Sequence, residues 1–201
     1  MVNELIAYCG PAAVPEDVWL RWNTDPVLIA ALAALAFWVT RRAANPRAGW
    51  AAIVLMALVF ISPLCALSSA LFSVRVLHHV ILVSAAAPLL ALAFPQRRAG
   101  VVPQALLVAA HAVALWVWHA PGPYAWGLAT VPGYWLMQIT LLGSAWWMWR
   151  AILANTTPNG SALVALAVTV GQMGVLGALI VFASVPLYPV HFASPLGWGF
   201  T

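Results

Sequence analysis

The segment Phe72–Pro95, FSVRVLHHVILVSAAAPLLALAFP, constrains the fold more than any other part of the sequence. It is apolar and long enough to cross a lipid bilayer as a helix, which takes about 20 residues. Near its start it nevertheless carries Arg75, His78 and His79. Ionisable side chains in a membrane segment normally face protein or a cavity, so they mark a candidate functional site. Alternatively, Arg75 extends to the lipid headgroups and the histidines bond neighbouring helices.

The composition of the chain indicates a membrane protein. Of its 201 residues, 65% are hydrophobic and 6% are charged, whereas a soluble domain has about a quarter charged residues. Long apolar runs without alternation favour helices over a β-barrel. We therefore predict an all-α, polytopic transmembrane helix bundle in the lipid bilayer. The net charge of +4 comes from scattered arginines without any lysine, which indicates membrane topology and not nucleic-acid binding.

Apolar stretches separated by breaks predict about six spans. They cover approximately residues 26–40, 50–61, 72–95, 102–119, 134–152 and 162–185. The bundle as a whole occupies residues 25–185, between an N-terminal arm (1–24) and a C-terminal tail (186–201). Two connections, 64–71 and 120–133, are expected to be small-residue and turn-rich segments. Three glycines of the last span, at 171, 174 and 177, suit close packing, either within the chain or against a partner.

The arginines predict the orientation of the bundle. Six of them lie at the ends of the first, third and fifth spans: Arg41, Arg42, Arg47, Arg97, Arg98 and Arg150. Only Arg21 and Arg75 lie toward the other side. Because positive residues are enriched on the inner side, we expect both termini outside. The first 25 residues contain all four acids and no basic start, so we expect no cleavable signal peptide.

This topology collects potential metal ligands near the outer face. Cys9, Cys65 and His119 fall at or beyond the interface, while His78 and His79 lie roughly 10 Å inside it. His111 lies roughly 12 Å deeper than His119, so it can match His79 (or His78) in depth on an antiparallel helix. Imidazole and thiolate together suit copper, zinc or haem iron.

Each of these residues also has a structural interpretation. His119 could bond the carbonyl-rich end of its own helix, and His111 could simply hydrogen-bond across helices. For Cys9 and Cys65, a disulfide, copper binding and no role are all compatible with the sequence. No carboxylate lies in a span after Asp25, which argues against an acidic proton relay. Because the nucleotide-binding and hydrolase motifs are missing as well, we expect no enzyme activity.

Four stretches carry a family resemblance: YCGPAAVPEDVWLRWNTDPVLI, SPLCALSSALFSVRVLHHVILVSAAAPLLALAFP, WVWHAPGPYAWGL and LGALIVFASVPLYPVHFASPLGWGF. In this order, and over nearly the whole length, the chain resembles the CtaG-type (caa3-type) cytochrome c oxidase assembly factors. The resemblance implies a multi-pass protein of the bacterial inner membrane. It also implies contact with oxidase subunits and a role in maturing a haem-copper oxidase, in particular its copper centres, on the outer face.

The sequence departs from the family pattern at several positions. The family typically has His-Met-x-x-His in the third span, where this chain has Arg75 and His79. A pair of histidines typical of the fifth span is replaced by Tyr134 and Gln138, whereas the Trp-His-Ala-Pro motif around His119 is kept. The resemblance also implies a further span beyond the tail, which this sequence lacks. Arg75 would repel a cation beside His79 unless an anion intervenes.

Three functions follow as hypotheses. The leading one is a non-enzymatic assembly factor that handles copper through His79 and His119, with His78, His111, Cys65 and Cys9 as weaker ligands. The second is a metal-free structural or accessory subunit of a respiratory membrane complex. The third is a haem-binding protein that uses the depth-matched pair His79 and His111.

Overall fold

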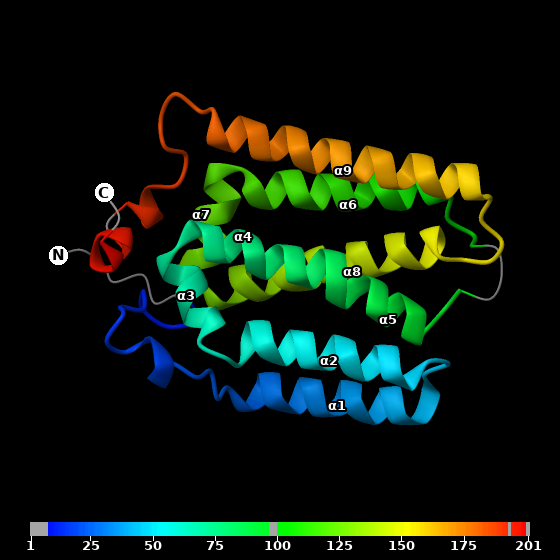
Figure 1. Cartoon of the computed structure of the whole chain (residues 1–201), viewed down its shortest axis with the longest axis horizontal. Coiled ribbons are helices and arrows are strands. Elements are labelled where there is room, and N and C mark those ends of the chain that lie inside the picture. Colours follow the sequence, from blue (N-terminus) through cyan, green and yellow to red (C-terminus); the bar gives the residue numbers. More distant parts are fainter. Residues whose placement is uncertain (1–7, 97–99, 193, 200–201) are drawn as a thin grey trace.

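The computed structural model describes residues 8–96, 100–192 and 194–199. Within these ranges the chain forms helices and no strand, which confirms the all-α class. The main helices run side by side (Figure 1). They are α1 (Pro26–Arg42), α2 (Pro46–Phe60), α3 (Leu64–Ala70), α4 (Phe72–Ile81), α5 (Ala87–Ala93), α6 (Gln104–His119), α7 (Pro121–Ala129), α8 (Val131–Ile152) and α9 (Asn159–Val181). A π-helical turn, η2 (Leu82–Ala86), joins α4 to α5, and short 3-10 turns lie in the arm and the tail.

Each predicted span contains a long helix at about the predicted position. By length and hydropathy, the continuous helix Phe72–Ala93 and α9 could each cross a bilayer. The bent pairs α2–α3 and α6–α7 would raise the number to four if each pair formed one span. The full set of six spans stays a prediction.

Three helices begin with a capping side chain followed by proline. Asp25 accepts a hydrogen bond from the Val27 backbone at the start of α1, and Asn45 accepts one from Ala48 at the start of α2. The side chain of Thr130 does the same at α8. A proline in the first turn has the φ angle that a helix needs and lacks an N–H that would be left unpaired. These signals set the boundaries of the helices from local sequence alone.

The connection 120–133 was predicted to be turn-rich and is largely helical, so that prediction was wrong; the small-residue connection 64–71 is helical as well. Helix α3 is bent by 48° from α2, and α7 by 75° from α6. At the second bend Ala120 is extended, with ψ of 139°, because a residue that precedes proline avoids the helical region. Pro121 then starts a new helix immediately. The result is that the end of α6, with His119, faces a short helix instead of a loop.

The π turn in the middle of Phe72–Ala93 has a specific cause. Pro88 has no N–H and clashes with the carbonyl four residues earlier in a regular helix, and a wider turn relieves that clash. In a π-helical turn a carbonyl accepts from the N–H five residues later. The Val83 carbonyl would pair with Pro88, which has no N–H, so it has no partner within its own helix. The Trp149 indole of α8 donates to this carbonyl at 2.9 Å. The carbonyl that Pro88 leaves unpaired is thus hydrogen-bonded by a tryptophan of another helix.

The core lies between α2, η2, α5, α6 and α8, and α9 contributes little to it. Gly49 permits the tightest approach in the core, because a Cβ added there would lie 2.6 Å from Val39 Cγ1 of α1. The three glycines of α9 behave differently. A Cβ at Gly171, Gly174 or Gly177 would meet nothing within 4 Å. The alternative that these glycines pack closely within the chain is therefore wrong.

The arm and the tail lie at one end of the bundle, together with α3 and α7 (Figure 1). The α1–α2 and α8–α9 turns lie at the opposite end. Arg41 and Arg42 occupy the last turn of α1, and Arg150 the last turn of α8, so these arginines share that opposite end. The assignment of the arm end to the outer face stays a prediction.

Candidate metal-binding site

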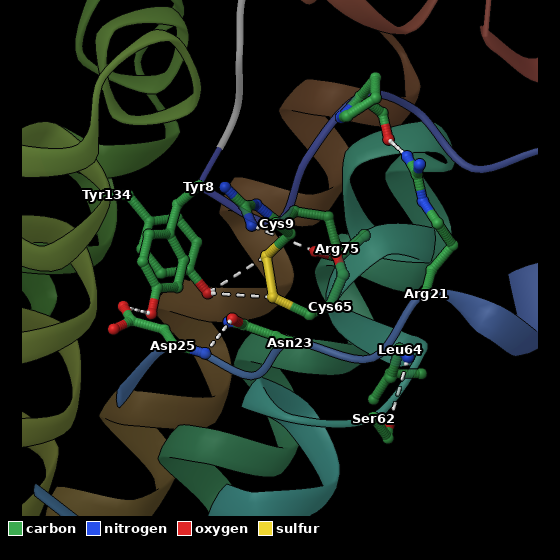
Figure 2. The surroundings of a disulfide bond; sticks show 12 residues. Tyr8, Cys9, Arg21, Asn23, Asp25, Ser62, Leu64, Cys65, Arg75 and Tyr134 are labelled. Carbon is green, nitrogen blue, oxygen red and sulfur yellow. Dashed lines mark hydrogen bonds between the residues drawn. A yellow bond between two sulfur atoms is a disulfide. The ribbon is translucent and has the colours of Figure 1, made fainter. Parts of the chain in front are cut away.

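A disulfide joins Cys9 of the arm to Cys65 of α3, with 5.3 Å between their Cα atoms (Figure 2). Of the three alternatives for these cysteines, the structure therefore contains the disulfide. Each sulfur also lies near the Tyr134 hydroxyl, at 3.7 Å for Cys9 and 3.9 Å for Cys65. Because thiolates are the metal ligands, the metal-binding prediction for this pair applies only to its reduced form.

The arm is held beside the disulfide by Tyr8. Its ring stacks on that of Tyr134, with 4.7 Å between centroids, and its hydroxyl donates to Asp25. This hydrogen bond is the main cause that lowers the pKa of Asp25 from its ordinary value. Burial, followed by the bond to Asp25, raises the pKa of Tyr8 to about 12. The arm is therefore a packed part of the structure from Tyr8 onward.

Arg75 is buried in the bundle and does not extend to the headgroups. Its side chain is 1% exposed, which contradicts the interpretation that it reaches the membrane surface. Nη1 donates to Ser68 Oγ at 3.2 Å, and the guanidinium lies 5.4 Å from the centre of the Tyr134 ring. Among the described residues, Nε and Nη2 have no hydrogen-bond partner.

His78 and His79 are likewise buried next to Arg75 on α4. Neither ring makes a hydrogen bond to a residue that the structure describes, so all four ring nitrogens lack a partner there. His78 packs edge-on against Phe60, with 5.2 Å between ring centroids. The alternative that these histidines simply bond neighbouring helices therefore finds no hydrogen bond in the described structure.

His79 faces His119 of α6, and the two ring centroids are 5.8 Å apart. His119 Nδ1 lies 2.7 Å from the Leu115 carbonyl. A carbonyl only accepts, so Nδ1 carries the proton and Nε2 presents a lone pair. His119 thus bonds its own helix end, as the structural interpretation expects, and still has a nitrogen available for a metal.

The two histidines line one cavity of about 200 Å³ between α4, α6 and α9. Met173 of α9 is the third potential ligand in its otherwise apolar lining. With metal–nitrogen bonds of about 2.0–2.1 Å, two imidazoles on one ion have ring centroids on the order of 5–6 Å apart. The observed spacing fits a shared ion. The described residues contain no group of three His, Cys, Asp or Glu side chains that could hold a metal.

This donor set favours a soft ion with few ligands. Thioether sulfur selects Cu(I), and imidazole suits copper as well as zinc. A tetrahedral structural zinc site would need four nitrogen or sulfur ligands. Sequence reasoning missed Met173 because a methionine in an apolar helix resembles ordinary packing. Met173 can be recognised as a potential ligand only when α9 is known to lie beside α4 and α6 at the cavity, and the sequence alone does not show that arrangement.

Residues 41–201 match the family described as cytochrome c oxidase caa3 assembly factor (Caa3_CtaG). The chain belongs to the Caa3_CtaG family. The resemblance stated from the sequence is confirmed, and with the apolar helices it indicates a membrane protein. No curated protein and no solved structure matches the chain.

The remaining histidines of this Caa3_CtaG chain have hydrogen-bond partners. His111 Nδ1 pairs with Ser144 of α8 at 2.9 Å, in line with a bond between helices. His191 of the tail pairs with the Tyr124 hydroxyl at 2.6 Å, and burial is the main cause that lowers its pKa. In the described structure His79 therefore contacts His119, whereas His111 bonds Ser144 between α6 and α8.

The positions at which the resemblance expects histidines come together in space. Arg75 and Tyr134, far apart in the sequence, are in contact at the arm end. Gln138 lies one turn further along α8, is buried, and has no partner for either side-chain polar atom. The Caa3_CtaG chain therefore has a polar cluster at these positions instead of further imidazoles.

Proposed function

We propose that this chain assists the assembly of a cytochrome c oxidase by receiving Cu(I) between His79 and His119 and passing it to an oxidase subunit. Membership of the caa3 assembly-factor family supports the oxidase as its target. The observation that carries the copper part is the ring pair at 5.8 Å in one cavity. We further propose that this occurs on the outer face of the bacterial inner membrane, in a multi-pass protein.

Copper is the cargo in this proposal, and the chain acts by binding it. His119 offers Nε2, because Nδ1 is committed to Leu115. His79 offers a ring without any hydrogen bond to break. A copper ion with few ligands can accept a ligand from the acceptor protein before a histidine departs. The site can therefore release the ion as well as bind it. Met173 lies on the most exposed wall of the cavity, since α9 is much less buried than the Phe72–Ala93 helix.

A second function, a metal-free accessory subunit of a respiratory complex, is favoured by Arg75. Its permanent charge lies one turn from His79 on the same helix face, where it opposes a second cation. The haem hypothesis receives no comparable support. It requires His79 and His111 to share a ligand, whereas His111 is bonded to Ser144.

Oxidase maturation in cells separates the first two functions. The chain would be removed and replaced by wild type, by His79→Ala, by His119→Ala or by the matched control His111→Ala. We expect oxidase from the first two variants to lack copper while its subunits are still made, and the control to resemble wild type. Stable recovery of the chain with mature oxidase at fixed stoichiometry, with full copper in every variant, would favour the accessory subunit instead.

A further inference from the structure

Arg75 carries a buried positive charge that no described group neutralises. The guanidinium stays charged at any accessible pH, and the side chain is almost fully removed from solvent. Its described neighbours are the Ser68 hydroxyl, the face of the Tyr134 ring and the Tyr124 hydroxyl. Figure 2 shows the Arg75 side chain beside the disulfide. A hydroxyl and a ring face attract a cation, but they do not cancel its charge.

The described ionisable side chains around Arg75 are neutral or basic at neutral pH. Those close enough for its charge to act on them come from α4, α6, α7, α8 and the tail: His78, His79, His119, Tyr124, Tyr134 and His191. Imidazole is neutral or cationic, and a phenol is protonated at neutral pH. Within the described part of the chain, these surroundings therefore supply no anion.

The described carboxylates are engaged elsewhere. Asp17 forms an ion pair with Arg21 at 3.6 Å, and Asp25 accepts from Tyr8. Glu16 is exposed on the arm. A buried ion without a counter-ion is strongly destabilising, so a protein retains one where something else compensates it.

The free donors of Arg75 indicate what compensates it. Nε and Nη2 have no partner, and these two atoms lie on one edge of the guanidinium with their N–H bonds parallel. This edge binds both oxygens of a carboxylate at once. A neutral acceptor would occupy a donor without supplying charge. We therefore propose that the Nε and Nη2 edge of Arg75 binds a carboxylate that comes from outside the chain.

His78 and His79 lie close to Arg75 on α4. Each neutral imidazole carries one N–H, and neither ring has a hydrogen-bond partner in the described structure. The carboxylate belongs either to a small free acid or to an Asp or Glu side chain of a partner protein. Both sources present a carboxylate to Arg75. The size of the largest carboxylic acid that the site accepts distinguishes them.

The test measures thermal unfolding of the purified, copper-free protein in detergent with sodium formate, against sodium chloride at equal ionic strength. A ligand that binds only the folded state raises Tm as its concentration increases. We expect formate to raise the Tm of wild type by several degrees and that of Arg75→Gln not at all. Arg75→Lys keeps the charge without the two-donor edge and should respond weakly, while the exposed control Arg47→Gln should respond like wild type.

Acetate and propionate then identify the source. A response to formate alone indicates a small free acid, whereas responses that extend to propionate indicate an Asp or Glu side chain. Line broadening of isotopically labelled formate gives a second measurement if Arg75→Gln folds poorly, with Arg75→Lys as the comparison. Equal responses in wild type and Arg75→Gln, or none in wild type, would overturn the proposal. A response that appears only in Glu4→Gln would also overturn it, because the carboxylate would then be the chain's own.

Discussion

Removal of the disulfide tests how the arm is attached to the bundle. The proposed change is Cys9→Ala with Cys65→Ala, which avoids placing a new hydroxyl at the buried position 65. The bond joins residues separated by 56 positions. For a fully flexible loop of that length, the entropy lost by the unfolded chain corresponds to about 4 kcal/mol of stability.

The structure of the loop reduces this value. Its 56 positions include α1, with 17 residues, and α2, with 15. If these helices persist in the unfolded state within a membrane or detergent, only the remaining residues are flexible, and the figure falls to about 3 kcal/mol. We therefore expect the double variant to lose about 3–4 kcal/mol of unfolding free energy.

The assay is reversible unfolding in detergent, with and without a thiol reductant. Reduced wild type should match the double variant, and the reductant should have no effect on the variant. Tyr8 should keep the arm near Tyr134 in both, because the ring stacking does not depend on the disulfide. Two titratable free thiols in native wild type, or a double variant as stable as the oxidised protein, would refute the reasoning.

Three further changes test the packing and the arm. Gly49→Ala should cost about 1–3 kcal/mol, because its Cβ would collide with a valine of α1, whereas Gly143→Ala has open space and should be neutral in the same unfolding assay. Trp149→Phe leaves the carbonyl of the π turn unpaired and should cost about 1–3 kcal/mol, whereas Trp147→Phe alters an exposed ring and should not. The lowered pKa of the aspartate that starts α1 gives stability that is present above its ordinary value of 3.8 and lost as pH falls through the lowered value. The raised pKa of Tyr8 gives stability that is present below 10 and lost as pH rises toward 12. Tyr8→Phe should reduce the alkaline loss and weaken the acid loss in a series of Tm measurements against pH, and an unchanged profile would contradict the hydrogen bond.

The helices could be predicted because their signals are local. Asp25, Asn45 and Thr130 each cap a helix that has a proline as its first or second residue, and long apolar runs follow. Helices α3 and α7 were missed because they are too short to show an apolar period. The same proline signal at Pro121 would have identified α7.

The site was only partly predictable, because its parts meet through the fold. Depth along the helices suggested a partner for His79, but the sequence does not fix how the helices are rotated. The structure brings His79 to His119 and turns His111 toward Ser144. The pairing of Cys9 with Cys65 likewise depends on where the arm folds back. Met173 entered the site only because α9 covers the cavity.

Copper content tests the central claim most directly. The purified protein would be loaded with Cu(I) under reducing conditions that preserve the disulfide, freed of excess metal and analysed for copper per chain. The comparison includes His79→Ala, His119→Ala and, as the control, His111→Ala. We expect about one copper per chain in wild type and in the control, and a loss of most of it in the other two variants. Copper at background in wild type, or equal copper in all four proteins, would contradict the account.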